Sequence, residues 1–377
     1  MNEKKMRRVA VVGGGAGGLA AAIAAGRALA AVTIYEKQNR VGKKLLKTGN
    51  GRCNLTNLAV SPADYNHSDF VAGILAQTDS AALLDFFSSL GLSTVADSEG
   101  RVYPRSDTAS SVLDVLRLGC AAAGVRENCS AEVCAVEREG ALYRLYFADG
   151  RYEEAERVIL ATGGGTAIAT GLGHRSVPFT PILCPLKTDT APIRGLSGLR
   201  VRARVSLLRR GKTIFTEEGE VLFRDYGVSG IVILNASRFA RPGDCLSLDL
   251  LPEETEEALS ARLASRPFGG EELLTGIFHR RVNEALVRCA KNGSPSALAE
   301  TIKAFRLTVQ GIGDAAGAQV TRGGADVSEF DPLTLESRLC PGIYMIGEAL
   351  DIDGRCGGFN LHWAFASGLA AGRSAAL

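Results

Sequence analysis

The hydrophobic pattern predicts a strand, a helix and a second strand at the start of the chain. Val9 to Val12 is a short apolar run of mainly β-branched residues, typical of a buried parallel strand. A segment rich in small residues follows as the helix, and Val32 to Tyr35 is the second apolar run. Neighbouring parallel strands need a crossover connection, so these segments predict a βαβ unit.

Later segments extend this α/β pattern. Helical patterns that end at glycine cover residues 79–91 and 106–124, and residues 92–103 predict two short strands between them. Alternating apolar and polar positions over 125–156 predict an antiparallel meander of three short strands. The apolar run that follows Arg157 predicts a return to the parallel sheet.

The middle of the chain has a different pattern. Several short strands predict a β-barrel-like insert, with strands near residues 201–208, 213–217, 221–223 and 245–250. Pro252, followed by acidic residues, marks a helix start. It opens a small helical insert, with helices expected over residues 253–265, 270–279, 281–291 and 295–305. The chain then returns through the barrel from Phe305.

Composition narrows the class of protein. At 377 residues the chain exceeds one simple core, and two or three domains are expected. A hydrophobic content of 46% and a net charge of +2 favour a soluble globular protein without a nucleic-acid or membrane partner. Nine dispersed cysteines without a C-x-x-C pair indicate reduced thiols in a cytoplasmic protein, with no zinc framework and no other metal site. The apolar run after the basic start stops at Gly13, too soon for a signal peptide.

A glycine-rich turn joins the first strand to its helix. Gly13, Gly15 and Gly18 have the spacing G-x-G-x-x-G. The first permits a tight turn, the second lets a pyrophosphate approach the backbone, and the third lets the helix lie close to the strand. The helix N-terminus, at Ala16 and Gly17, offers free N–H groups and the positive end of its dipole to phosphate.

Glu36 and the basic segment after it extend this candidate site. Glu36 ends the second strand, where a carboxylate can accept both hydroxyls of an adenosine ribose and repel a 2′-phosphate. The bound nucleotide is therefore expected to be FAD or NAD rather than NADP. The segment 37–57 is either a solvated loop or a source of cations near the pyrophosphate, through Lys43, Lys44, Lys47 and Arg52.

This basic segment resembles a known family. Gly42-Lys43-Lys44-Leu45-Leu46 and Thr48-Gly49-Asn50-Gly51-Arg52-Cys53-Asn54-Leu55-Thr56-Asn57 are similar to the signature of the BaiN-like flavoproteins. That family includes enzymes named aminoacetone oxidase and 3-dehydro-bile-acid Δ4,6-reductase. The resemblance covers nearly the whole chain. It implies an α/β fold with an FAD-binding Rossmann-like domain of the two-dinucleotide-binding flavoprotein type, an inserted β-barrel-like domain and a small helical domain. The expected boundaries are 1–187 with 320–377 for FAD, 188–251 with 306–319 for the barrel, and 252–305 for the helices.

Further motifs resemble the cofactor-contacting parts of such flavoproteins. One turn after a buried strand contains Thr162, Gly163 and Gly164, and Val133 lies where such proteins bind adenine through their backbone. In the last motif, Gly347 and Glu348 are expected at the ribityl chain, and a helix that opens at residues 357–360 points its N-terminus at the flavin. The resemblance implies noncovalent FAD held by Gly13, Gly15, Ala16, Gly17, Gly18, Glu36, Lys37, Lys43, Lys44, Asn50, Gly51, Arg52, Cys53, Asn54, Val133, Thr162, Gly163, Gly164, Gly347, Glu348, Gly357, Gly358, Phe359 and Asn360.

No residue is identified as catalytic by its sequence context. Tyr103, Arg105, His174 and His362 are candidates, and His174 is expected to structure a turn. The chain departs from the family in a shortened loop before His174. It also has Arg224-Asp225 where the family commonly has Thr-His, so the role of that histidine is not carried over. Cys53 is expected to fill space beside the cofactor, and the alternative is a redox partner of the flavin with a lowered pKa.

The resemblance implies an FAD-dependent oxidoreductase that acts on a small or ring organic substrate. The sequence has no second strand–GxGxxG–helix unit for NAD(P)H, so a nicotinamide reductant would reach the flavin directly. A reductase that uses NAD(P)H is favoured. An amine oxidase that uses O2 and a non-catalytic FAD-binding protein are the alternatives. The sequence identifies neither the substrate nor the oligomeric state.

Overall fold

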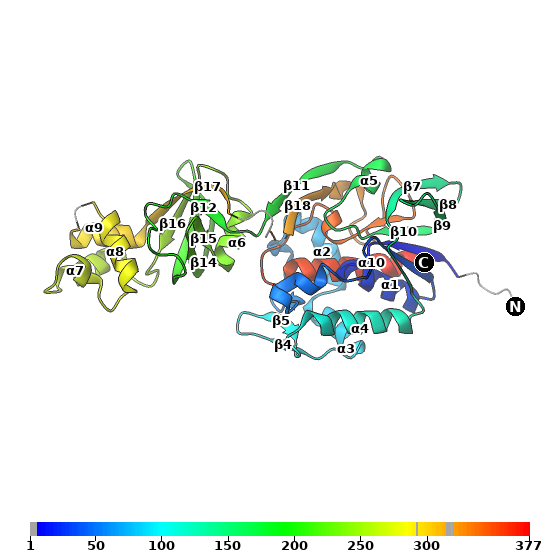
Figure 1. The fold of residues 1–377 in the computed structure, drawn as a ribbon, viewed down its shortest axis with the longest axis horizontal. Coiled ribbons are helices and arrows are strands. Elements are labelled where there is room, and N and C mark those ends of the chain that lie inside the picture. The colour runs from blue at the N-terminus through cyan, green and yellow to red at the C-terminus, as the bar shows by residue number, and fades with distance from the viewer. Residues whose placement is uncertain (1–5, 292, 314–317, 319) are drawn as a thin grey trace. The chain divides into compact units, whose positions relative to one another are not determined.

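The chain forms two compact units in the computed structural model, which describes residues 6–291, 293–313, 318 and 320–377 (Figure 1). Unit 1 combines Met1–Thr180 with Val320–Leu377, and unit 2 is Pro181–Gln319. Of the return segment expected in the barrel, residues 314–317 and 319 lie outside the described residues.

A five-stranded sheet is the centre of unit 1, and all four of its strand pairings are parallel. Its order is β19-β10-β1-β2-β6, with strands β1 (Arg8–Val12), β2 (Ala31–Glu36), β6 (Arg126–Cys129), β10 (Arg157–Leu160) and β19 (Ile343–Met345). The sequence pattern described above predicts β1, β2 and β10. It does not predict β6, which lacks an apolar run and lies at the edge of the sheet, where a polar strand is tolerated.

Helices α1 (Ala16–Arg27) and α10 (Phe359–Ala376) lie side by side in unit 1 (Figure 1). A Cβ atom at Gly368 would lie 2.3 Å from the carbonyl oxygen of Gly17, and one at Gly372 would lie 2.3 Å from that of Ala21. Both contacts advance in the same direction, so the two helices are parallel. By this register, the N-terminus of α10 projects about two turns, roughly 11 Å, past the N-terminal end of α1.

Smaller elements surround this framework in unit 1. An antiparallel meander, β7-β8-β9, confirms the three strands predicted over residues 125–156. The remaining elements are η1 (Leu45–Gly51), β3 (Thr56–Asn57), η2 (Pro62–Asp64), α2 (Ser68–Gln77), α3 (Ser80–Ser89), β4 (Thr94–Ala96), β5 (Arg101–Pro104), α4 (Ala109–Ala122), β7 (Val133–Glu139), β8 (Leu142–Phe147), β9 (Tyr152–Ala155), α5 (Ala167–Gly171), β11 (Ser176–Ile182), β18 (Val320–Ala325), η4 (Val327–Glu329) and η5 (Gly347–Ala349).

Unit 2 contains a closed barrel, as the sequence pattern predicts. Its strand order is β12-β15-β14-β13-β16-β17, and the strands are β12 (Leu186–Thr188), β13 (Arg200–Arg209), β14 (Lys212–Arg224), β15 (Gly227–Ser229), β16 (Cys245–Asp249) and β17 (Phe305–Ile312). The two strands predicted over 213–217 and 221–223 are one long strand, β14. Its residues stay paired with β13 across Glu218–Glu220, where the sequence suggests a break.

The helices of unit 2 share one hydrophobic core with the barrel. Leu259, Leu286 and Leu298 pack in the same buried cluster as the inward-facing Leu246 and Leu248 of β16. The helical elements are α6 (Ile231–Ser237), α7 (Glu256–Ala264), η3 (Gly270–Leu274), α8 (Arg280–Cys289) and α9 (Pro295–Lys303). The helix predicted over 270–279 is wrong, because the extended backbone of Thr275 (φ −60°, ψ +129°) ends a short 3-10 helix, and Gly276 after it is left-handed (φ +83°).

Candidate functional site

The first glycine turn leaves open space at the N-terminus of α1. A Cβ at Gly13 (φ +108°) would lie 2.3 Å from the carbonyl oxygen of Ala161, and a Cβ at Gly18 would lie 2.0 Å from that of Gly13. Both positions therefore require glycine for the tight turn and the close packing. By contrast, a Cβ at Gly15 would meet no atom within 4 Å. Gly15 is the N-cap of α1, where the first N–H groups of a helix have no intrahelical partner, so the open space lies where a phosphate-binding turn requires it.

Glu36 lies beside this turn. Its carboxylate accepts hydrogen bonds of 2.8 Å from the backbone N–H of Gly14 and 2.8 Å from that of Gln38. The loop that leads to Val133 is held at the same end of β2, since the N–H of Ala131 donates to the carbonyl oxygen of Glu36 at 2.9 Å. The residues expected at the ribose and the adenine are therefore neighbours.

The basic segment contacts the turn through its backbone, and one of its expected lysines, the exposed Lys44, forms an ion pair with the last motif. Gly42 N–H donates to the carbonyl oxygen of Gly14 at 2.8 Å. Lys44 forms an ion pair with Glu348, whereas Lys43 donates to the side chain of Gln38 at 3.1 Å. Lys37 is exposed and has no ion-pair partner within the described ranges.

A second glycine turn meets β18 and η5. Gly163 has left-handed backbone (φ +64°) and would carry its Cβ into open space, and the Cβ position of Gly164 is 3.6 Å from the hydroxyl of Thr321. That same hydroxyl donates to Glu348 at 2.8 Å, and Thr321 N–H donates at 2.9 Å. The sequence-predicted turn at Thr162 and the motif at Gly347 thus come together.

Gly347 and Glu348 already have protein partners. Gly347 N–H donates to Ser367 Oγ at 3.1 Å, and Trp363 Nε1–H donates to the carbonyl oxygen of Gly347 at 3.1 Å. The carboxylate of Glu348 is bonded to Lys44 and Thr321. Gly347 and Glu348 therefore hold the segment that contains them against α10 and β18. Contacts to a ribityl chain would be additional to these bonds.

The N-terminus of α10 faces an unpaired buried acceptor. Asn54 is 9% exposed, and its side-chain oxygen Oδ1 has no hydrogen-bond partner among the described residues. A Cβ at the helix cap Gly358 (φ +103°) would lie 2.8 Å from this oxygen. Leaving a buried acceptor without a donor costs about 1–3 kcal/mol. A lone acceptor beside free helix N–H donors is complementary to the N3–H and C2=O edge of an isoalloxazine, so these residues fit a flavin ring.

Residues in the first turn of α10 form hydrogen bonds within the protein. Asn360 Oδ1 accepts from Gly354 N–H at 2.8 Å, and its Nδ2–H group donates to the carbonyl oxygen of Gly354 at 3.0 Å. Phe359 is buried, and its carbonyl oxygen accepts from the hydroxyl of Tyr65 at 2.8 Å. Gly357 and Gly358 therefore offer only backbone groups to a ligand. Asn360 holds the preceding loop in place.

The segment Asn50–Cys53 has unusual backbone. Asn50 and Cys53 are non-glycine residues with left-handed conformations, at φ +56° and +58°. Cys53 is completely buried, and this burial raises the pKa of its thiol to about 12. A neutral buried thiol favours the packing role over the redox role. Gly51, by contrast, has open space at its Cβ position.

Of three of the four candidate catalytic residues, two are buried histidines with both ring nitrogens bonded within the protein, and the third is exposed. His362 is buried between the hydroxyl of Thr56 (2.8 Å from Nδ1) and the carbonyl oxygen of Thr78 (3.0 Å from Nε2), and burial lowers the pKa of its ring to about 4. His174 is buried between Glu329, 2.8 Å from Nδ1, and Ser337, 3.0 Å from Nε2. Arg105 is an exposed residue beyond the end of β5.

Tyr103 differs from these three. Its side chain is half-buried, and its hydroxyl has no hydrogen-bond partner within the described part of the chain. The guanidinium carbon of Arg52 lies 4.2 Å from the centre of its ring, and Arg52 Nε donates to Asp107 at 2.5 Å. Burial raises the pKa of Tyr103, so its hydroxyl stays protonated at neutral pH.

Residues that sequence reasoning missed complete the site. Asp353, fully buried, accepts from Arg322 Nε at 2.9 Å, and Asp351 accepts from Gly323 N–H at 3.1 Å. These carboxylates tie β18 to the loop before α10, as Thr321 does through Glu348. No local sequence signal marks such pairs, because their partners lie far apart in the chain.

The fold and the site define a class of protein. Two glycine turns, an acid at the end of β2 and a parallel second helix N-terminus are the features of an FAD-dependent oxidoreductase of the two-dinucleotide-binding type. The chain belongs to the family described as HI0933-like protein Rossmann domain, which matches residues 7–374.

Relatives and a solved structure agree with this membership. The chain is 37% identical to the 3-dehydro-bile acid delta(4,6)-reductase of Clostridium scindens, over 98% of this chain and 99% of that protein. It is 28% identical to the ribosomal RNA dihydrouridine synthase of Escherichia coli, over 95% of each. The open conformation of a flavocytochrome c3 fumarate reductase is similar in fold, with a TM-score of 0.51, 16% identity, and coverage of 100% of this chain and 79% of that one.

The structure also bears on metal ions and membranes. The described residues contain no group of three or more His, Cys, Asp or Glu side chains that could hold a metal ion. Within the described ranges, no single helix is long and apolar enough to cross a membrane; α2 and α3 meet that test only as a pair, bent by 45°.

Proposed function

We propose that this protein is an NAD(P)H-dependent reductase of a carbon–carbon double bond conjugated to a carbonyl group. The observation that carries the proposal is the 37% identity, over 98% of the chain, to a reductase whose named substrate is such a compound. A 3-dehydro steroid with Δ4,6 unsaturation is a conjugated dienone. The second relative is named for dihydrouridine, which is uridine saturated at a double bond conjugated to a carbonyl. Both names describe one chemistry on different ring systems.

The site geometry supports this chemistry. The N-terminus of α10, with its positive dipole end, and the unpaired Oδ1 of Asn54 are suited to the pyrimidine edge of a flavin. A helix N-terminus stabilises negative charge, which favours a reduced, anionic ring. FAD, when bound and reduced, supplies the hydride that adds to the carbon β to the carbonyl.

Tyr103 is the proposed proton donor. Saturation of the double bond needs one hydride at the β-carbon and one proton at the α-carbon, and the electron pair of the double bond forms the new C–H bond there. Tyr103 has a protonated hydroxyl without a protein partner in the described chain, whereas both candidate histidines have each ring nitrogen occupied. The net reaction consumes the substrate, NAD(P)H and a proton, and yields the saturated ketone and NAD(P)+.

FAD is proposed to bind noncovalently. The buried thiol of Cys53 is a poor nucleophile, because burial raises its pKa to about 12. Precipitation of the holoprotein with acid should release yellow colour into the supernatant, and colour that stays in the pellet would contradict noncovalent binding.

The reaction is tested by separating its two halves without oxygen. The holoprotein is mixed with NADH or NADPH while the flavin absorbance is followed, and the reduced protein is then mixed with a 4-en-3-one or 4,6-dien-3-one steroid, an unmodified ribosomal RNA transcript, or aminoacetone. Bleaching by a nicotinamide followed by reoxidation with an enone supports the proposal. Reoxidation by the transcript alone would assign uridine as the substrate.

Two outcomes contradict the proposal. Bleaching of the oxidised protein by aminoacetone, with peroxide formed in air, identifies an amine oxidase. A flavin that responds to no nicotinamide, enone, transcript or amine identifies a non-catalytic FAD-binding protein.

A further inference from the structure

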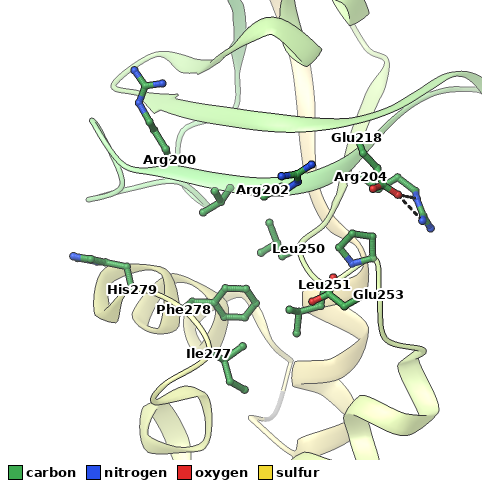
Figure 2. Close-up of a pocket in the computed structure, with 12 residues that line it drawn as sticks. Arg200, Arg202, Arg204, Glu218, Leu250, Leu251, Glu253, Ile277, Phe278 and His279 are labelled. Carbon is green, nitrogen blue, oxygen red and sulfur yellow. Dashed lines mark hydrogen bonds and ion pairs between the residues drawn. The ribbon is translucent and has the colours of Figure 1, made fainter. Parts of the chain in front are cut away.

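A groove in unit 2 has no role in the proposed reaction. It encloses about 580 Å³ between strand β13 and the loop that precedes α8, with the linker after β16 beside it (Figure 2). Its apolar lining comes from three separate segments: Val201 of β13, the linker residues Leu250, Leu251 and Pro252, and the loop residues Ile277 and Phe278. This volume falls in the range of sites for drug-sized ligands, about 300–1,000 Å³.

Three arginines of β13 line one side of the groove. Arg200, Arg202 and Arg204 alternate along the strand, so they share the face opposite to the buried Ala203 and Val205. Figure 2 shows Arg202 between the other two, with Arg204 turned toward Glu218.

Only one of these cations is uncompensated. Arg200 pairs with Glu220, and Arg204 Nη2 lies 2.6 Å from a carboxylate oxygen of Glu218. Arg202 is exposed and has no ion-pair or hydrogen-bond partner within the described residues. The groove therefore offers one free guanidinium, which can hold a carboxylate with two parallel hydrogen bonds.

His279 lies at the end of the groove, next to Phe278 in the chain. Its Nδ1 accepts the N–H of Arg281 at 3.2 Å and caps the N-terminus of α8. In Figure 2 its ring is directed away from Arg202, so the guanidinium of Arg202 is the group that we assign to the ligand's charge.

The charge balance decides between a nucleic acid and a small anion. A nucleic-acid strand carries a negative charge on every phosphate and needs a continuous basic groove. Here Glu218 and Glu253 line the groove, and Glu220 lies on the neighbouring strand opposite Arg202. A strand of phosphates would meet these carboxylates, whereas a ligand with a single negative charge need contact only Arg202.

We infer that this groove is a binding site for an amphipathic monocarboxylate, a compound with an apolar ring or chain and one carboxylate. The apolar body lies on Phe278, Ile277 and Leu250, and the carboxylate pairs with Arg202. The inference concerns unit 2 alone and goes beyond the proposed reaction, so a failure of enone turnover does not affect it.

Calorimetric titration of the holoprotein with cholate, below its micelle concentration, tests the inference. The matched ligand is the corresponding C24 alcohol, which keeps the apolar body and loses the charge. We expect saturable binding of cholate and binding of the alcohol that is weaker by about tenfold or more, the scale of one charged hydrogen bond. Arg202→Gln should lower the affinity for cholate to that of the alcohol, and leave the affinity for the alcohol unchanged.

Two variants make the test specific. Arg210→Gln removes another exposed arginine of the same barrel, at the turn between β13 and β14, and should leave both affinities unchanged. Phe278→Ala should weaken both ligands, and its circular dichroism spectrum reports whether the unit stays folded. The inference is overturned if cholate does not saturate the wild-type protein, if Arg202→Gln binds it as the wild type does, or if a single-stranded RNA oligonucleotide binds through Arg202 instead.

Discussion

The carboxylate of Glu36 accepts the backbone N–H of Gly14 at 2.8 Å, so the end of β2 is tied directly to the first glycine turn. We propose that the same carboxylate also binds a ribose, in addition to this hydrogen bond. Glu36→Ala should weaken FAD binding by about 1–3 kcal/mol, the scale for loss of a charged hydrogen-bond partner. The measurement is the dissociation constant of FAD by fluorescence quenching, with Glu132→Ala, an exposed carboxylate, as the control. An unchanged dissociation constant would refute the ribose assignment.

Asn54→Leu separates cofactor binding from protein stability. The apoprotein gains a side chain of similar size without an unpaired buried oxygen, so its free energy of unfolding should be equal or higher. FAD affinity should fall by about 1–3 kcal/mol, because a flavin N–H loses its acceptor. A variant that binds FAD as tightly as the wild type would show that Oδ1 does not face the ring.

Substitutions of Cys53 distinguish packing from redox chemistry. Cys53→Ser should retain FAD and turnover within a few-fold, because a completely buried thiol whose pKa is raised to about 12 is not a redox partner at neutral pH. Cys53→Leu should lose FAD through overpacking, at a cost of about 1–3 kcal/mol. Loss of turnover in the serine variant with its flavin content intact would place the thiol in the mechanism.

Tyr103→Phe should slow the reoxidation of reduced flavin by an enone about 100-fold or more, the contribution of a positioned acid. Flavin content and the rate of reduction by NAD(P)H should not change, since neither step uses this proton. The control is Tyr152→Phe, an exposed tyrosine of the meander. Equal reoxidation rates in Tyr103→Phe and the wild type would exclude Tyr103 as the acid.

His362 predicts a loss of stability at acid pH. Burial lowers its pKa from 6.5 to about 4 in the folded protein, so the unfolded chain takes up the proton first as the pH falls. The contribution is complete above pH 6.5 and is lost between about pH 6.5 and 4, which amounts to about 2 kcal/mol between pH 7 and 5.

Urea unfolding measures this loss as a change in the free energy of unfolding. It is followed by the fluorescence of Trp363, the single tryptophan, which is next to His362 in the chain. His362→Gln can still donate to the carbonyl oxygen of Thr78 and does not titrate. Its stability should fall by about 2 kcal/mol less than that of the wild type over this range. Parallel pH profiles would show that His362 titrates normally.

The elements with local signals are those that the sequence predicts well. The strand–turn–helix around Gly13 and the return strand at Arg157 each have their pattern within a few residues, and the structure confirms them. The polar strand β6 and the break in the helix expected at 270–279 depend on the sheet edge and on backbone angles, which composition does not report.

The site divides in the same way. Glycine spacing identifies where a phosphate can approach, because each glycine acts on its own neighbours. The unpaired oxygen of Asn54 beside Gly358 and the ion pair of Lys44 with Glu348 join segments about 300 residues apart. The pair of Arg322 with Asp353 and the bond of Thr321 to Glu348 join segments 31 and 27 residues apart. Only the folded chain shows them.

The parallel contact between α1 and α10 has a consequence for biosynthesis. The ribosome completes α1 at Arg27 and does not begin α10 until Phe359, so the small-residue face of the first helix waits through most of synthesis without its partner. Unit 2, a continuous segment, can fold during that interval, while unit 1 cannot close. We therefore expect the cofactor to bind only after α10 has been made, and a nascent chain stalled before Phe359 to leave the small-residue face of α1 uncovered.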